Sequence, residues 1–172
     1  MGRTTDLRRE LKRTFYPYVT DRGFQIDKST GPHSVDFRRF SPDHIDVFDL
    51  QWEKYGCPRF VVNFGQVPST GVTHFGEYVP PEKVLSYMGP QSGRLQPRLG
   101  AGTSSWFNQD RSLLRRFVFR QAVRPAVEVV DELVSLFQEL EGWFEHGQLG
   151  AHMKLLPYPW QRNKENQNHV QL

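Results

Sequence analysis

Five arginines follow one another at helical spacing in the second half of the chain and could bind phosphate or carboxylate groups. They are Arg111, Arg115, Arg116, Arg120 and Arg124. Guanidinium groups form charge-assisted hydrogen bonds with both kinds of anion. Positive charge near the start of a helix is unfavourable with the helix dipole, so a compensating anion is expected. The simpler interpretation is a row that is solvated or paired with acids of the same chain, and a partner or nucleic-acid surface is the alternative.

The distribution of charge along the sequence is more informative than its total. The 172 residues include 22 Lys and Arg and 19 Asp and Glu, which gives a net charge of +3. Residues 94–124 carry seven arginines and one aspartate, whereas residues 125–146 carry six acids and neither Lys nor Arg. A +6 segment and a −6 segment therefore meet at Pro125. Adjoining charges of opposite sign favour oriented, fast encounter with another protein.

The other residues capable of chemistry do not form a catalytic or metal-binding pattern. The glycine-containing stretch 100–105 lacks the Gly-Lys-Ser/Thr ending of a phosphate-binding loop. His44 and Asp46 could supply two metal ligands from one strand, but a closed site needs three or four. Cys57 could be a nucleophile only beside a base. We therefore expect no metal and no cofactor, and we favour a protein that is not an enzyme.

Composition indicates one globular domain in a reducing compartment. The single cysteine excludes an internal disulfide. There is no apolar run as long as a membrane span, and the first residues do not resemble a signal peptide. We expect a cytoplasmic protein without membrane contact, with a single domain over residues 1–147 and an extended or disordered tail over residues 148–172.

The first 67 residues predict one helix followed by strands. Apolar residues at helical spacing predict a helix over about residues 5–22, with Pro17 kinking its last turn and Gly23 ending it. The period then changes to two, which predicts strands over residues 24–28, 34–40, 44–54 and 58–67. Apolar residues of both parities in the third of these indicate a central strand that is covered on both faces. In the fourth, the side with Phe60, Val62 and Phe64 is expected to pack under helices.

The rest of the chain predicts a long loop, two short strands and two helical segments. The expected elements are a loop over residues 68–93 with a helical turn at 81–87, strands over 94–99 and 105–107, a helix from about Gln109 to Pro125, and a helix over 127–146 that ends at Gly147. The predicted fold class is α+β, with an antiparallel sheet of about five strands packed against an N-terminal helix and a C-terminal helical pair.

Several short motifs occur in an order that is typical of one family. They are Pro17 with Gly23-Phe24, then Gln51, Asn63-Phe64-Gly65, Arg98-Leu99-Gly100 and Trp106. This order resembles the bacterial family catalogued as domain of unknown function 4304, over roughly residues 6–145. The stretch 100–105 and the long C-terminal tail depart from the family's pattern. The resemblance implies a fold class and supplies no mechanism.

The resemblance selects Gln51, Asn63, Arg98 and Trp106 as candidate site residues. A Gln and an Asn on adjacent strands, beside an Arg and a Trp, would form a polar recess able to bind an anionic or amide-bearing ligand. The simpler alternative is a buried hydrogen-bond network that fixes strand register. Whether Gln51 and Asn63 share a face depends on the register, which the sequence does not give.

We therefore expect a non-enzymatic intracellular protein-binding domain with a protein partner. Small stand-alone proteins of this kind can occur near bacterial toxin genes, which is the only reason for naming an immunity or antitoxin protein that neutralises a bacterial toxin as its specific form. The alternative is a protein that binds nucleic acid or a phosphate ligand through the arginine row. An enzyme in the recess is a third hypothesis, and no nucleophile or general base supports it.

Overall fold

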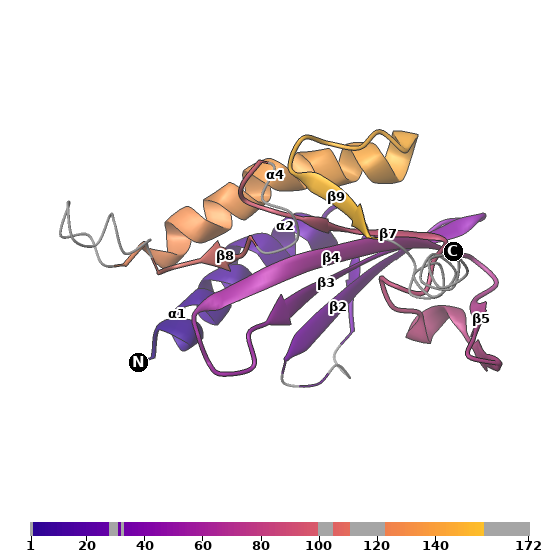
Figure 1. Cartoon of the computed structure of the whole chain (residues 1–172), viewed down its shortest axis with the longest axis horizontal. Coiled ribbons are helices and arrows are strands. Elements are labelled where there is room, and N and C mark those ends of the chain that lie inside the picture. Colours follow the sequence, from indigo (N-terminus) through magenta and orange to yellow (C-terminus); the bar gives the residue numbers. More distant parts are fainter. Residues whose placement is uncertain (1, 28–30, 32, 100–104, 111–122, 157–172) are drawn as a thin grey trace, which may run out of the picture.

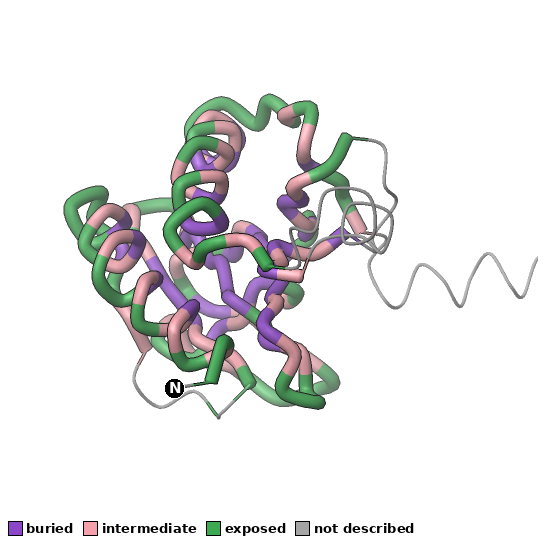
Figure 2. The backbone as a smooth tube through the Cα atoms, turned by 90° about the vertical axis from the view of Figure 1, so that its left-hand side faces the viewer, coloured by how far each residue is buried: buried purple, intermediate pink, exposed green. Residues whose placement is uncertain are grey.

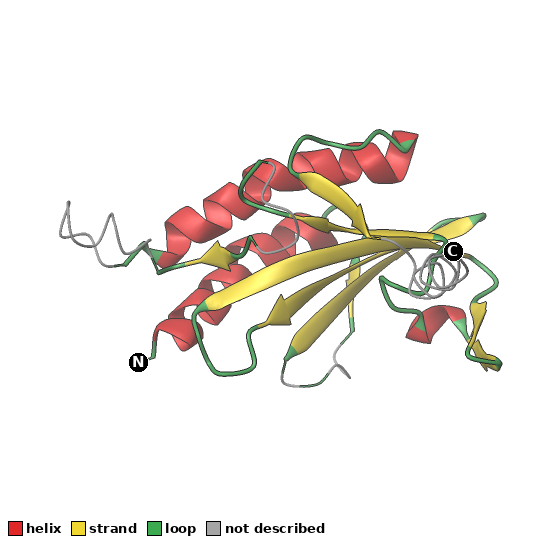
Figure 3. Ribbon diagram, in the orientation of Figure 1, coloured by secondary structure: helices red, strands yellow, loops and turns green. Residues whose placement is uncertain are grey.

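The computed structural model describes residues 2–27, 31, 33–99, 105–110 and 123–156. Within these ranges, an N-terminal helix and a long C-terminal helix lie on one face of an antiparallel sheet (Figure 1; Figure 3). The α+β fold class that the sequence predicts is confirmed. Among the described residues the sheet has seven strands, where we expected about five.

The N-terminal helix is continuous over three segments, α1 (Arg3–Glu10), a π turn (Leu11–Phe15) and α2 (Tyr16–Thr20). We predicted a kink at Pro17, and the structure has a π turn that ends at Phe15, just before Tyr16 and Pro17, where the Tyr16 N–H bonds to the Leu11 carbonyl. The wider turn suits a proline, whose ring would otherwise collide with a carbonyl of the preceding turn. Gly23, with φ of 86°, follows the helix end as predicted.

The strands of the main sheet lie in the order β1-β2-β3-β4-β7-β9, and β8 pairs with the start of β4. Their bounds are β1 Gln25–Ile26, β2 Ser34–Phe40, β3 His44–Trp52, β4 Arg59–Pro68, β7 Gln91–Leu95, β8 Phe107–Asn108 and β9 Met153–Leu156. A separate hairpin consists of β5 (Val72–His74) and β6 (Glu77–Val79), and a 3-10 turn follows at Pro81–Lys83. The long helix is α4, Ala126–His146.

The main core lies between the helices and the sheet, where Figure 2 shows the buried positions. Phe15 and Phe137 bring the two helices together with ring centroids 5.3 Å apart. Beneath them, Phe37 and Phe48 stack across β2 and β3 at 4.5 Å. The predicted packing of Phe60, Val62 and Phe64 under the helices is confirmed.

A second, smaller core covers part of the opposite face of the sheet. Ile45 and Val47 of β3 pack there with Val67 of β4 and with Val84 of the segment between β4 and β7. This packing explains the apolar residues of both parities in β3, as predicted. The segment approaches β4 closely at Gly65, where a Cβ atom would overlap the carbonyl oxygen of Ser86. Only glycine therefore fits at this position of β4.

The C-terminal half departs from the prediction in its strands. The predicted strand over 94–99 is β7, which runs from Gln91 to Leu95, and the segment 68–93 that we expected to be a loop contains the β5–β6 hairpin. Residues 153–156 form β9 beside β7, so the sheet extends past the tail boundary that we predicted at residue 147. The helix predicted from about Gln109 to Pro125 is wrong at its described ends, where Asp110 pairs with Val123 in an antiparallel bridge. Its residues 111–122, and residues 157–172 of the tail, lie outside the described residues.

Candidate functional site

A row of polar side chains crosses the sheet on the face opposite the helices. Its members lie directly opposite one another on successive strands: Asp36 on β2, Asp49 on β3, Asn63 on β4, Arg94 on β7 and Lys154 on β9. Directly opposed residues of antiparallel strands point to the same side of a sheet. We call these five residues the polar row. Acids occupy one end, bases occupy the other, and an amide lies at the centre.

Hydrogen bonds of Asn63 join the two ends of the polar row. Its Nδ2 donates to Asp49 Oδ1 at 2.9 Å and to Gln51 Oε1 at 3.1 Å. Its Oδ1 accepts a hydrogen bond from Arg94 Nε at 3.1 Å. Because both the amide nitrogen and the amide oxygen are engaged, the Asn63 side chain has one fixed orientation.

The acidic end of the polar row is buried. Asp49 is 8% exposed, and burial raises its pKa from 3.8 to about 6. Hydrogen bonds from Ser86 and Asn63 oppose this shift, whereas the charge of Asp36 adds to it. Burial also raises the pKa of Asp36, although the charge of Arg38 opposes the change. Two neighbouring carboxyl groups with raised pKa values are typical of functional sites and of buried polar networks alike.

The basic end of the row is the part that solvent reaches. Lys154 and Gln51 are exposed, and Asn63 and Arg94 are half-buried. Burial lowers the pKa of Arg94, and the charge of Asp49 opposes the change. The accessible surface therefore combines amide groups with positive charge.

A small pocket adjoins the accessible end of the polar row. It has a volume of about 180 Å³ and lies against Asn63, Ser86, Tyr87, Ser92 and Leu156, among others. Its lining residues come from β4, β7, β9 and the segment before β7.

The structure brings together two of the four residues that the resemblance selects. Gln51 and Asn63 share a face and are hydrogen-bonded. Arg98 is exposed after the end of β7, and Trp106 lies 5.1 Å from the Arg59 guanidinium. Across the described ranges, neither Arg98 nor Trp106 forms a hydrogen bond or ring contact with Gln51 or Asn63. Arg94 occupies the place that we expected Arg98 to take.

Sequence reasoning missed most of the polar row. Period-two alternation placed Asp49 on the same side of its strand as Gln51, so that residue could have been found. Arg94 and Lys154 could not have been found from the sequence, because their position beside Asn63 depends on the pairing of β7 with β4 and β9.

The arginine row is described only at its last member. Arg111, Arg115, Arg116 and Arg120 lie outside the described residues. Arg124 Nη1 lies 3.0 Å from Glu132 Oε2, and Arg124 Nε lies 3.8 Å from Glu128 Oε2. At this residue, pairing with acids of the same chain is what the structure shows.

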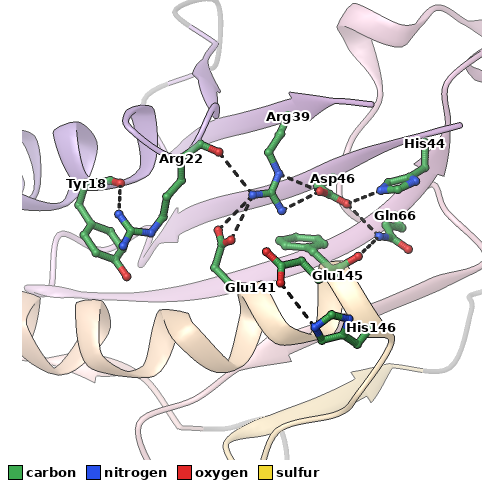
Figure 4. A network of polar contacts seen from close by, with 10 residues as sticks. Tyr18, Arg22, Arg39, His44, Asp46, Gln66, Glu141, Glu145 and His146 are labelled. Carbon is green, nitrogen blue, oxygen red and sulfur yellow. Dashed lines mark hydrogen bonds and ion pairs between the residues drawn. The ribbon is translucent and has the colours of Figure 1, made fainter. Parts of the chain in front are cut away.

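A second polar cluster lies on the helix side of the sheet, centred on Arg39 (Figure 4). Arg39 Nε and Nη2 each lie 2.9 Å from Asp46 Oδ2, and Nη1 lies 3.1 Å from Glu141 Oε2. Gln66 Nε2 donates to Asp46 Oδ1 and to the carbonyl of Phe144, both at 2.9 Å. The cluster therefore ties the C-terminal half of α4 to β2, β3 and β4.

The electrostatics of the Arg39 cluster favour the charged pair. Burial disfavours the charged guanidinium, but the hydrogen bond to Asp46 and the charge of Glu141 raise the pKa of Arg39 overall. The ring of Phe24 lies 4.5 Å from the same guanidinium. Because elements of the fold supply all these partners, we interpret the cluster as structural.

The candidate metal ligands form only a pair. His44 Nε2 lies 3.4 Å from Asp46 Oδ1. In the part of the chain that the structure describes, no group of three or more His, Cys, Asp or Glu side chains is placed to hold a metal ion. None of the helices in that part is long and apolar enough to cross a membrane.

Comparison with known families agrees with the motif order. Residues 15–130 match the family model described as Domain of unknown function (DUF4304). Comparison with curated proteins and with solved structures finds no match. The matched region includes β1 to β8 and the start of α4, and thus four of the five residues of the polar row. Because the match covers more than half of the sequence, the chain belongs to this family of unknown function.

Proposed function

We propose that this chain is a non-enzymatic protein-binding domain whose binding surface is the accessible end of the polar row. The observation that carries the proposal is the fixed placement of Asn63, Arg94 and Lys154 on the sheet face opposite the helices. Hydrogen bonds hold Asn63 and Arg94 before any partner arrives. A preorganised surface of amides and bases favours a partner with acidic groups, because opposite charges fix orientation and speed association.

The specific form that we propose is an immunity or antitoxin protein that neutralises a bacterial toxin inside the cell. Stoichiometric binding of another protein, without chemistry, is what such a protein requires. The continuous pairing of the sheet supports this role, since β3 and β4 pair over nine residues and β7 and β9 extend the row beside them.

Co-purification from the native host tests the proposal. Tagged wild-type protein should retain one partner in stoichiometric amount. Lys154→Glu should reduce the retained partner at least tenfold, whereas Lys12→Glu, the same charge reversal on the N-terminal helix, should retain it. Co-expression with the partner should protect cells if the partner is toxic. No stoichiometric partner, or equal loss in both variants, would contradict the proposal.

The alternative is a nucleic-acid or phosphate binder, which the opposed Arg94 and Lys154 favour locally. Its discriminating property is salt dependence, because phosphate contacts release counterions and weaken steeply with salt. Titration of a fluorescent DNA or RNA duplex should show no binding at physiological salt if the protein-binding proposal is correct. Tight binding that weakens steeply with salt and is lost in Lys154→Glu would favour the alternative.

A further inference from the structure

The β5–β6 hairpin presents one aromatic ring almost entirely to solvent. Phe75 at its tip is 93% exposed, and its φ is 50°. Gly76 follows with φ of 84°. Two-residue hairpin turns need positive φ at such positions, and they normally use Asn, Asp or Gly there because bulky side chains are strained. Phe75 is thus a strained residue that gains almost no burial within the chain.

The base of the hairpin is firmly held. Val72 and Val79 pack against the second core through Ile45, Val47, Val67 and Val84. Tyr78 Oη donates to the carbonyl of Thr70 at 2.8 Å. Figure 1 shows the hairpin near the end of the sheet, away from α1 and α4. The tip is therefore presented from a fixed support, which lowers the entropic cost of binding through it.

Aromatic side chains connect the tip to the proposed binding surface. The His74 ring lies 4.3 Å from that of Phe75 and 5.7 Å from that of Tyr87. Tyr87 is partly exposed and lines the same pocket as Asn63. The surface therefore continues from the polar row, across the pocket, to Phe75.

We propose that Phe75 inserts into an apolar pocket of the protein that binds the polar row, with Glu77 and Glu82 facing basic residues around that pocket. This inference rests on the proposed function and adds the anchor of the interface. A few residues that become buried in pockets of the partner carry most of the binding energy of a protein interface, and aromatic residues are frequent among them. A strained backbone conformation that gains no burial within the chain indicates a role in binding another molecule.

The shape and charge of the tip favour a protein pocket over other occupants. A single protruding ring fits a concave apolar site. The segment over residues 69–90 carries Glu77, Glu82 and Lys83, so its charge is −1 with histidine neutral. Glu77 and Glu82 are both exposed. Their carboxylates would be repelled by nucleic-acid phosphates and by anionic lipid headgroups.

The first test needs only the protein itself. Asparagine adopts positive φ more readily than phenylalanine, so Phe75→Asn should leave unchanged or raise the urea midpoint of unfolding. The control is Tyr55→Asn, which removes an 80% exposed aromatic from the β3–β4 connection and should leave the midpoint unchanged. A lower midpoint for Phe75→Asn alone would overturn the inference, because Phe75 would then stabilise its own chain.

The second test maps the contact in the native host. A photo-crosslinking phenylalanine analogue at position 75 should link to the protein that co-purifies with the wild type, and the analogue at position 55 should not. Phe75→Asn should reduce the retained partner at least tenfold, and Glu77→Lys should also reduce it.

Different outcomes separate this inference from the proposed function. A partner that depends on Lys154 but neither crosslinks at position 75 nor depends on Phe75 would overturn the hairpin inference alone. Absence of any partner for the wild type would overturn both. Crosslinking between two copies of the chain, or Phe75-dependent binding to vesicles of phosphatidylcholine and phosphatidylglycerol, would overturn the assignment of a protein pocket.

Discussion

The hydroxyl of Ser86 donates a 2.6 Å hydrogen bond to Oδ2 of Asp49 and so joins the segment before β7 to the middle of β3. This contact depends on Gly65, because a Cβ atom there would overlap the Ser86 carbonyl oxygen. The buried end of the polar row and the segment that carries the hairpin are thereby coupled.

Asp49→Asn should remove a pH-dependent part of the stability. Burial raises the pKa of Asp49 from 3.8 to about 6, so the folded state binds a proton more tightly than the unfolded state does. The resulting stabilisation is fully present below about pH 4 and is lost as the pH rises through about 6, with an upper size of about 3 kcal/mol. Urea unfolding of both proteins from pH 4 to 7 should show wild type losing stability relative to Asp49→Asn. A difference in the free energy of unfolding that stays constant from pH 4 to 7 would contradict this prediction.

Gly65→Ala should destabilise the protein by about 1–3 kcal/mol, because the added methyl overlaps backbone that cannot easily move. Gly142→Ala is the matched control, since a Cβ at this position of α4 meets nothing within 4 Å. It should stabilise by about 0.5–1 kcal/mol through helix propensity. Chemical denaturation measures both. Equal effects of the two substitutions on the free energy of unfolding would show that the backbone around Ser86 moves to accommodate a methyl group at position 65.

Arg39→Ala should destabilise by about 3–5 kcal/mol, because it leaves buried Asp46 without its guanidinium partner. Arg39→Lys should recover only part of this, since an ammonium group cannot reproduce the two-pronged contact with Asp46 and the stacking on Phe24. Arg13→Ala, which removes a helix-surface pair with Glu10, is the control and should change the denaturant midpoint little. Wild-type stability in Arg39→Lys would show that charge alone matters.

Glu139→Ala should loosen β9. Its carboxylate accepts the backbone N–H of His152 at 2.8 Å and lies 2.6 Å from the His152 ring, just before the strand begins. Loss of these bonds should cost about 1–3 kcal/mol. Hydrogen exchange at residues 153–156 should become faster, whereas Glu145→Ala, an exposed change on the same helix, should not alter it. Unchanged exchange in Glu139→Ala would mean that pairing with β7 suffices.

The strands of the first half could be predicted because each carries its own periodic pattern. The observed ends of β2, β3 and β4 lie within about two residues of the predicted ends. Beyond residue 68 the local pattern predicts the long helix α4 and its end at Gly147, but it does not predict the strands. Strand β9 has only four residues, and pairing with β7 and contacts from Glu139 place it in the sheet. Such a strand has no signal that distinguishes it from an extended tail.

The candidate site could also be predicted only in part, where local motifs and alternation mark its residues. The motif order identified Gln51 and Asn63, and alternation within β3 fixed which of its residues share a face. Register decided the rest, because a slip of one residue moves every side chain of a strand to the other face. It is register that sets Arg94 rather than Arg98 beside Asn63.

The sequence by itself determined the fold class, the N-terminal helix, the first strands and the family, because these depend on local periodicity and on short motifs. Only the tertiary structure decided that two acids, an amide and two bases from five strands form one row, and that Ser86 reaches Asp49 over Gly65. Both depend on contacts between residues far apart in the chain. The long-range packing that creates them also buries Asp49 and holds the hairpin that presents Phe75.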